Sequence, residues 1–323
     1  SKSVLLLDPC FSGSKRGWMH DSGPGENAAG DNRAFGAIES YLIYRLTGGQ
    51  HVTDASNASR TMLMTLTGED WDDELLALFD IPKAALAQIV DCAGHLGSTS
   101  ADLFGSAIPI CGSAGDQQAA TIGQACLEIG QTKATFGTGA FILTNSGQVA
   151  PNSEHRLLST VLCQLQGQRT YALEGSVFVA GSLMQWLRDD IGLLKFAGES
   201  EELARSVSHN GGVYLVPALS GLGAPHWRAD ASATISGLSF SATKAHIVRA
   251  ALEAMAHQCH DLKTAFSGDG VDWRSLRIEG RMVANGWLVP GLVDIIDIPA
   301  APPELFETTA LGAAMLAAVG AGM

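Results

Sequence analysis

The chain has 323 residues, of which 46% are hydrophobic and 16% are charged, and its formal net charge is −13 at pH 7. This balance excludes an intrinsically disordered chain, and the acidic charge argues against a nucleic-acid partner or an anionic membrane surface. The length suffices for two domains with separate cores. No apolar run reaches the ~18 residues of a membrane helix, and the six cysteines form no Cys-x-x-Cys pair. A cytoplasmic protein with buried, reduced thiols is therefore expected.

The first third of the chain predicts two helices, at 35–46 and at 71–79, and a short apolar strand at 108–112. Three apolar residues would form the buried face of the first helix: Ile38, Leu42 and Ile43. Asp70 would cap the second helix. A glycine turn follows the strand, so this region ends at a point where a loop side chain can reach a ligand.

Glycines separate the predicted strands in the middle of the chain. Strands at 132–136 and 140–144 flank Gly137-Thr138-Gly139, a pattern typical of a hairpin. Another strand is expected at 170–173, with a helix behind it at 176–187. These elements bring turn residues to the ends of strands.

The last third begins with a predicted buried strand at 213–217 and continues with a long helix capped by Thr243. Apolar residues recur along that helix at steps of three or four: Val248, Leu252, Met255, Cys259, Leu262 and Phe266. A strand at 276–278, a helix from Val283 and a small-residue helix at 308–319 complete the chain. Alternating strands and helices indicate an α/β protein.

The first candidate site residue is Asp116, in Gly115-Asp116-Gln117-Gln118 after the strand at 108–112. At the end of a strand its carboxylate would face the crevice where α/β proteins bind ligands, and there it would act as a general base toward a hydroxyl. The alternative is that Asp116 only caps the helix that begins at Gln117.

The second candidate is the hairpin tip Gly137-Thr138-Gly139. Glycines let a phosphate approach backbone N–H groups, and the Thr138 hydroxyl adds a donor. An ordinary tight turn is the alternative. Neither a P-loop nor a Gly-x-Gly-x-x-Gly pattern is present in the sequence.

Two further places would suit a nucleotide. Gly181 and Gln185 share a helix face, where a flat ring would fit beside the amide, although close helix packing at the glycine explains the pattern equally well. Glu279-Gly280-Arg281 and Asn285 lie on a strand-to-helix turn, a usual place for nucleotide contacts and a common one for glycine.

A metal site is not predicted. His257 and Asp261 share a face of the long helix near Cys259 and His260, but no further ligand group is close in sequence. Packing and solvated polar groups explain these residues better than a bound ion.

Several longer stretches carry a resemblance to a known family. They span nearly the whole chain: Leu7-Asp8-Pro9 with Phe11-Ser12-Gly13, Val52-Thr53-Asp54, Asn57-Ala58-Ser59-Arg60-Thr61-Met62-Leu63, Gly115-Asp116-Gln117-Gln118-Ala119-Ala120, Phe136-Gly137-Thr138-Gly139, Tyr171-Ala172-Leu173-Glu174-Gly175-Ser176-Val177-Phe178, Gln185-Trp186-Leu187-Arg188-Asp189, Pro217-Ala218, Ser220-Gly221-Leu222-Gly223-Ala224-Pro225 and Thr308-Thr309-Ala310-Leu311-Gly312-Ala313-Ala314. In this combination the chain resembles the FGGY carbohydrate kinases, and among them the members that phosphorylate glycerol.

The resemblance implies an α/β fold of the actin/hexokinase-like (ribonuclease H-like) ATPase type with two lobes, 1–122 and 123–323. It implies ATP-dependent phosphorylation of a small polyol, glycerol to glycerol 3-phosphate, with ATP and Mg²⁺ in the cleft and Asp116 as the general base. Three further residues would contact the polyol: Gln117, Phe141 and Cys10. The residues implied for the nucleotide are Gly137, Thr138, Gly139, Gly181, Gln185, Gly280, Arg281 and Asn285.

The chain also departs from the family pattern. It has neither the Asp-x-Gly-Thr-Thr hairpin nor the Arg-Glu pair of the family, so a truncated first lobe and hardly any phosphoryl transfer by this chain alone are expected. Cys10 replaces a tyrosine, and Glu279 and Arg281 replace the aspartate and the second glycine of an Asp-Gly-Gly turn. A kinase for another polyol or ketose, a non-catalytic metabolite-binding relative and association into a homo-oligomer all stay open.

Overall fold

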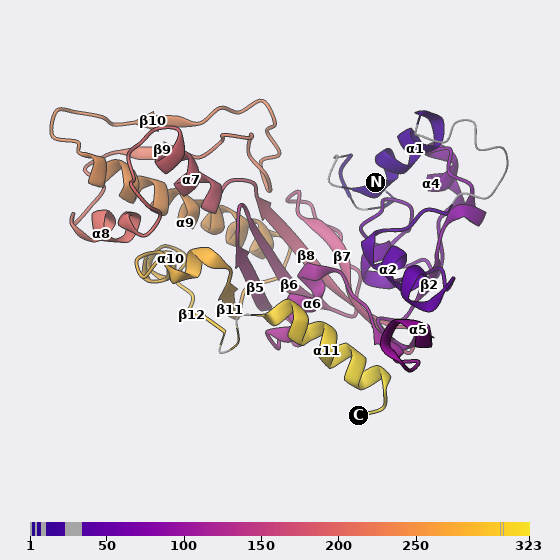
Figure 1. Ribbon diagram of the computed structural model, residues 1–323. Coiled ribbons are helices and arrows are strands. Elements are labelled where there is room, and N and C mark those ends of the chain that lie inside the picture. Colours follow the sequence, from indigo (N-terminus) through magenta and orange to yellow (C-terminus); the bar gives the residue numbers. More distant parts are fainter. Residues whose placement is uncertain (1, 4, 8–10, 23–33, 304, 306) are drawn as a thin grey trace.

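A computed structural model describes the chain except for residues 1, 4, 8–10, 23–33, 304 and 306 (Figure 1). The strands are β1 (Val52–Asp54), β2 (Gln88–Val90), β3 (Ala93–Ser98), β4 (Pro109–Gly112), β5 (Gln131–Phe136), β6 (Ala140–Gly147), β7 (Leu158–Leu165), β8 (Gln168–Val177), β9 (Tyr214–Val216), β10 (Thr234–Ser236), β11 (Ser275–Glu279) and β12 (Ala300–Ala301).

Helices connect and cover these strands. They are α1 (Ser12–Ser22), α2 (Ile38–Thr47), α3 (Ala55–Ala58), α4 (Asp73–Leu78), α5 (Ala101–Phe104), α6 (Asp116–Gly123), α7 (Gly181–Asp189), α8 (Glu199–Arg205), α9 (Lys244–Gly268), α10 (Leu288–Ile296) and α11 (Thr308–Gly320), with 3₁₀ turns η1 (Lys83–Ala85) and η2 (Arg281–Ala284). None of the helices in the described part of the chain is both long and apolar enough to cross a bilayer.

A six-stranded mixed sheet forms the centre of the molecule, in the order β12-β11-β5-β6-β8-β7. The first three strands run parallel to one another, and β6, β8 and β7 continue the sheet antiparallel. Residues paired across neighbouring strands point to the same face of the sheet, and so do residues two positions apart on one strand. Lys133 and Glu174 therefore share a face with the paired residues Thr135, Phe141 and Glu279. This face, called the polar face below, therefore carries charged and hydroxyl side chains, with Leu143 between Lys133 and Glu174.

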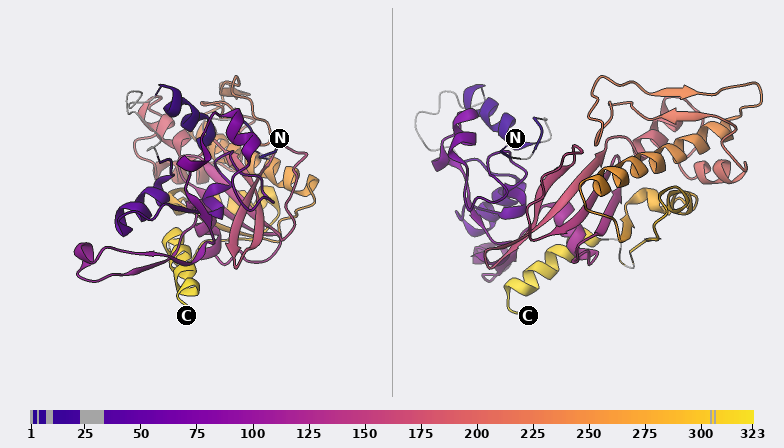
Figure 2. Two further views of the ribbon diagram at one scale, coloured as in Figure 1. Left: turned by 90° about the vertical axis from the view of Figure 1, so that its right-hand side faces the viewer. Right: turned by 180° about the vertical axis from the view of Figure 1, so that it is seen from behind.

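Helices pack on both faces of this sheet. The apolar face, which contains Ala134, Ile142 and Leu173, packs against the long helix α9 in the main hydrophobic core. A Cβ atom at Gly175 would approach the Leu262 side chain of α9 to 2.5 Å, so this glycine permits the close approach. The polar face meets α6 and α11, and the layers are visible in Figure 2.

The amino-terminal region packs against the β7–β8 edge of the sheet (Figures 1 and 2). Its own core contains Leu63 and Trp71 and also takes in Val161 and Tyr171 from the sheet. A partly buried ion pair of 2.9 Å joins Arg60, just after α3, to Glu174 of β8. The two parts of the chain are thus held together through polar as well as apolar contacts.

Most predicted elements are confirmed, including the hairpin of β5 and β6, the strands β4 and β11, and the helix α11. The long helix α9 begins after Thr243 with a capping box, and its six apolar residues at steps of three and four are all buried. The spacing of the apolar residues and the capping residue Thr243 are both strong local signals, which explains why this helix was predicted correctly.

Two predictions in the first third are wrong in detail. On α2 only Ile43 of the predicted apolar face is buried, whereas Ile38 and Leu42 are 74% and 50% exposed, because the helix packs through its Ser40–Ile43 side. The second helix begins at Asp73 with Asp72 as its cap. Asp70 instead forms an ion pair with Lys83 at 2.7 Å.

Three boundaries later in the chain also differ. The helix predicted from residue 176 begins at Gly181, because Ser176 and Val177 still pair with β6. The helix expected from Val283 is a short 3₁₀ turn, η2, and α10 begins only at Leu288. The strand predicted at 213–217 is present as β9, but it is buried on one side only: Val213 and Leu215 lie in the main core, whereas Tyr214 and Val216 are exposed.

Candidate active site

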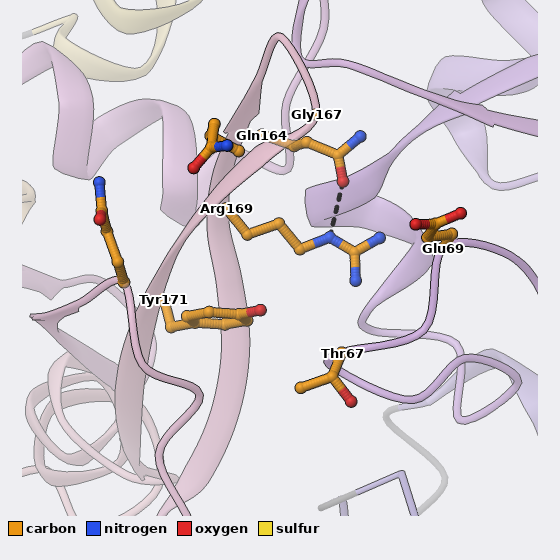
Figure 3. Close-up of a pocket in the computed structure, with 8 residues that line it drawn as sticks. Thr67, Glu69, Gln164, Gly167, Arg169 and Tyr171 are labelled. Carbon is orange, nitrogen blue, oxygen red and sulfur yellow. Dashed lines mark hydrogen bonds between the residues drawn. The ribbon is translucent and has the colours of Figure 1, made fainter.

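A polar pocket at the β7–β8 hairpin contains none of the predicted site residues (Figure 3). Arg169 occupies its wall and donates to the carbonyl oxygens of Leu66 and Gly68 at 2.6 and 2.7 Å. Its Nε donates to Gln164 at 2.6 Å. The Arg169 guanidinium therefore holds the loop at 66–68 against the sheet. Because this pocket contains none of the predicted site residues, the candidate site lies elsewhere.

Asp116 is the first residue of α6, and its side chain is exposed. Gly115 is the N-cap, and no side chain caps this helix. The interpretation of Asp116 as a capping residue is therefore wrong, and its carboxylate remains available in front of the polar face of the sheet. The turn between β4 and α6 carries it there.

A buried carboxylate fixes the backbone immediately before Asp116. Asp54 has no exposed surface, and it accepts hydrogen bonds from the hydroxyls of Ser56 at 2.5 Å and Ser113 at 2.8 Å. The Gly115 N–H in turn donates to Ser56 Oγ at 2.9 Å. Asp54 also caps α3 through two backbone N–H groups. Sequence reasoning missed this role, although an Asp that precedes Ser56-Asn57 is a recognisable capping signal.

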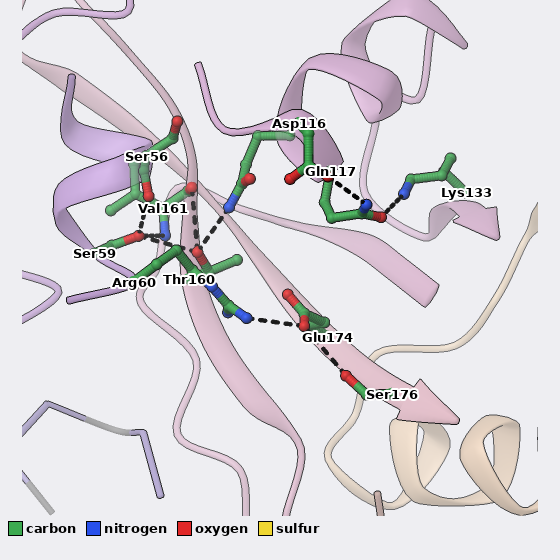
Figure 4. A network of polar contacts seen from close by, with 11 residues as sticks. Ser56, Ser59, Arg60, Asp116, Gln117, Lys133, Thr160, Val161, Glu174 and Ser176 are labelled. Atoms are coloured by element: carbon green, nitrogen blue, oxygen red, sulfur yellow. Dashed lines mark hydrogen bonds and ion pairs between the residues drawn. The ribbon is translucent and has the colours of Figure 1, made fainter. Parts of the chain in front are cut away.

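Gln117 connects Asp116 to a buried lysine (Figure 4). Gln117 Nε2 donates to Asp116 Oδ2 at 3.0 Å, and Lys133 Nζ donates to Gln117 Oε1 at 2.5 Å. Burial lowers the pKa of Lys133 to about 8, against the opposing effect of Glu279 and other nearby carboxylates. A lysine inside a strand gave no sequence signal, so this residue was also missed.

The polar network continues from Lys133 toward the turn at Gly280. Lys133 donates to Thr135 at 3.0 Å, Thr135 donates to Glu279 at 2.6 Å, and Thr308 of α11 donates to the other oxygen of Glu279. Gly280 follows with φ +97°, and a Cβ there would lie 2.3 Å from the Phe136 carbonyl oxygen. Only glycine fits this position.

The hairpin tip and the start of α7 lie against each other. Gly181 N donates to Gly137 O at 2.9 Å, and Ala180 N and Ser182 N donate to Thr138 O at 2.9 and 3.1 Å. A Cβ at Gly181 would meet Gly137 O at 2.5 Å and the Met282 side chain at 3.3 Å. This glycine therefore serves the close packing of backbone on backbone. The tip also includes Gly139, whose own Cβ would meet Val177 O at 2.5 Å.

A small pocket of about 150 Å³ lies beside η2, and Met184, Arg281 and Asn285 are among its lining residues. Asn285 Nδ2 donates to Ser200 Oγ at 2.9 Å, and its Oδ1 accepts the N–H groups of Trp287 and Leu288 at the start of α10. Arg281 is exposed and has no hydrogen bond or ion pair with another described residue. Gln185 is exposed on α7 and does not line this pocket.

The remaining predicted residues are placed as follows. Phe141 of β6 is 38% exposed and lies opposite Thr135 on the polar face of the sheet. Cys10 lies outside the described residues. Within the described ranges no group of three His, Cys, Asp or Glu side chains is arranged to hold a metal ion, and the helix residues His257 and Asp261 are no exception.

This combination of a mixed sheet between helices, a hairpin tip against a helix start and an exposed carboxylate in front of the sheet defines an actin/hexokinase-like ATPase fold of the sugar-kinase type. Residues 132–321 match the C-terminal domain, and residues 1–123 the N-terminal domain, of the FGGY family of carbohydrate kinases. The chain belongs to this family.

Individual relatives agree with this assignment. The glycerol kinase of Rhodospirillum centenum is 50% identical over 326 residues, which cover all of this chain and 66% of the relative. That of Coxiella burnetii is 47% identical and covers 100% of this chain and 65% of the relative. The chain thus spans just under two thirds of the length of these relatives.

Solved structures show the same fold. The glycerol kinase of Plasmodium falciparum with ADP superimposes with a TM-score of 0.91 at 34% identity, covering 99% of this chain and 65% of that chain. The xylulose kinase of Rhodospirillum rubrum superimposes with a TM-score of 0.84 at 24% identity, with coverage of 99% and 65%. At that identity the second match speaks for the fold alone.

Proposed function

We propose that the chain contributes the general base and part of the nucleotide site of an ATP-dependent polyol kinase whose substrate is glycerol. The observation that carries this proposal is the exposed carboxylate of Asp116, which caps no helix while Gly115 and Gln117 on either side of it are held by hydrogen bonds. Relatives at 47–50% identity that are named glycerol kinase support the choice of polyol.

The proposed reaction is an in-line phosphoryl transfer. A hydroxyl of the polyol donates its hydrogen bond to Asp116, which takes the proton as the oxygen attacks the γ-phosphorus of ATP. The bond from that phosphorus to the bridging oxygen breaks, so the products are a phosphate ester and ADP. Because such a transition state needs positioning and charge stabilisation, a fixed base and fixed donors suit it. Gln117, Phe141 and Cys10 are the proposed polyol contacts.

The nucleotide is proposed to lie between the hairpin tip and the turn after β11. Thr138 would offer its hydroxyl and backbone to phosphate, with Gly137, Gly139, Gly181 and Gly280 giving close approach, and Arg281, Asn285 and Gln185 would lie nearer the base. The Mg²⁺ would arrive with ATP and neutralise phosphate charge. Because Mg²⁺ in a kinase site is held largely by phosphate oxygens and water, it requires no cluster of protein carboxylates, and the described residues form none.

The two lobes are proposed to be 1–122 and 123–323. The matches to the family's two domains, at 1–123 and 132–321, support a boundary at the end of α6. Asp116 would then be the last functional residue of the first lobe, beside the sheet of the second.

Binding measurements on this chain and transfer measurements on a completed version of it test the proposal. We expect calorimetry to detect one-to-one binding of MgADP and of glycerol. Because this chain alone is expected to transfer hardly any phosphate, transfer from γ-³²P-ATP is measured on a version that also carries the Asp-x-Gly-Thr-Thr hairpin of the family. There, glycerol-dependent ester formation should fall at least 100-fold in Asp116→Asn, the loss expected for a general base. The control Asp102→Asn changes an exposed aspartate of α5 and should match the wild type. Equal transfer by Asp116→Asn and wild type would contradict the proposal.

A further inference from the structure

The side-chain amide of Gln117 lies between two groups that can each play only one hydrogen-bonding role. Lys133 Nζ contacts its oxygen at 2.5 Å, and Asp116 Oδ2 contacts its nitrogen at 3.0 Å. A lysine ammonium donates only, and an ionised carboxylate accepts only. The amide therefore has a single orientation in which both neighbours are satisfied, and reversing it would oppose donor to donor and acceptor to acceptor.

Lys133 is itself held firmly. Its side chain has no exposed surface, and its second hydrogen bond goes to Thr135, whose hydroxyl donates to Glu279. A lysine is rarely buried unless nearby negative charge compensates its own. Here the compensating carboxylates belong to three elements: Glu279 of β11, Glu174 of β8 and Asp116 of α6. The ammonium is thus a donor in a fixed position next to the Gln117 side chain (Figure 4).

We propose that Lys133 is a positioning residue that fixes the Gln117 amide with its nitrogen, and not its oxygen, toward Asp116 and the polyol. The consequence for the polyol rests on the proposed function. With Oε1 engaged by Lys133, Gln117 offers the polyol only N–H, while Asp116 offers only acceptor oxygens. The site then requires a substrate that accepts a hydrogen bond beside the hydroxyl that it donates, which a vicinal diol does.

The first test needs no ligand. In nitrogen-15 NMR the side-chain NH₂ signal of Gln117, assigned by its loss in Gln117→Glu, is followed with pH in the unliganded chain. We expect it to shift with a midpoint near 8, together with the Lys133 Cε signal, because burial lowers the pKa of Lys133 to about 8. Burial raises the pKa of the nearby Cys126 thiol to about 11, so its titration falls outside this range of pH. A Gln117 signal that ignores the Lys133 titration in the wild type would overturn the proposal.

The second test separates positioning from general damage. Lys133→Met should lower glycerol affinity about tenfold in calorimetry, the effect of one hydrogen bond to a charged group. In the Gln117→Ala background, Lys133→Met should lower glycerol affinity less than about twofold, because the effect of Lys133 on the polyol depends on Gln117. Equal losses in both backgrounds would indicate a merely structural role and overturn the proposal.

Thr132→Val is the matched control. This neighbour on β5 loses a buried hydrogen bond to Thr144 on the opposite face of the sheet, so it weakens the same strand without touching Gln117. Its glycerol affinity should stay within about twofold of the wild type. A tenfold loss here would mean that any weakening of β5 damages the site and would count against Lys133. If the wild-type chain binds no polyol, the proposed function fails, while the NMR titration still decides the role of Lys133.

Discussion

The carbonyl oxygen of Gly137 accepts the N–H of Gly181 at 2.9 Å, which joins the tip of the β5–β6 hairpin to the first turn of α7. These two glycines are 44 residues apart in the chain, and a Cβ atom at Gly181 would lie only 2.5 Å from the Gly137 carbonyl oxygen. The first N–H groups of α7 therefore donate to carbonyl oxygens of the hairpin. These hydrogen bonds hold the tip in place where a phosphate is proposed to bind.

Gly181→Ala tests this contact. The added Cβ would lie 2.5 Å from a backbone oxygen, so the hairpin tip and helix must separate. Overpacking of this kind costs about 1–3 kcal/mol of stability. We expect the melting temperature and the MgADP affinity both to fall. In the control Gly198→Ala the new Cβ meets only an aromatic ring at 3.5 Å, so its melting temperature should be nearly unchanged.

Asp54→Ala tests the anchor behind Asp116. The substitution would leave the buried hydroxyls of Ser56 and Ser113 without their acceptor, and each unsatisfied buried donor costs about 1–3 kcal/mol. We expect urea denaturation to show a loss of about 3 kcal/mol or more. The exposed Asp102→Ala should cost less than about 0.5 kcal/mol. A loss under about 1 kcal/mol for Asp54→Ala would show that this network does not anchor the turn.

The sequence predicted the class of the fold and the exposed acid of the candidate site, but not the residues that hold that acid. Asp116 follows a strand at a glycine turn, a signal contained within a few residues, and the periodic face of α9 is equally local. Lys133 acts through Gln117, 16 residues away. Asp54 gives a local signal as the cap of α3, but it reaches the turn before Asp116 through Ser113, 59 residues away. Such contacts exist only once the strands are in register, and no local pattern encodes them.

The same reason explains the errors. Ile38 and Leu42 have the helical spacing of a buried face, yet spacing identifies only which residues lie together and not what covers them. Ser176 and Val177 suit a helix start as well as a strand end, and pairing with β6 decides between the two. In both cases tertiary packing overrides the local signal.

Lys133 should also give the folded chain an unusual dependence on alkaline pH. Its pKa is lowered from 10.5 to about 8, so between these values the unfolded chain binds a proton that the folded chain has lost. Stability from this group therefore rises with pH above about 8, by up to about 3 kcal/mol. Urea denaturation of wild type and Lys133→Met should show a difference that grows in favour of the wild type from about pH 7.5 to 10. A difference that stays flat with pH would be inconsistent with a buried ammonium at this position.

Arg281 offers the final prediction, because its free guanidinium stands at the turn beside the proposed nucleotide site. Arg281 is exposed and forms no ion pair with another described residue. It follows Gly280, a position where no side chain fits. If it reaches phosphate, Arg281→Ala should weaken MgADP binding several-fold at low salt, and the effect should shrink as salt screens an exposed charge. Arg274→Ala removes another exposed arginine and should have no such effect. Tighter MgADP binding by Arg281→Ala would instead mean that the arginine obstructs the pocket, and a non-catalytic relative would then become the better interpretation of this chain.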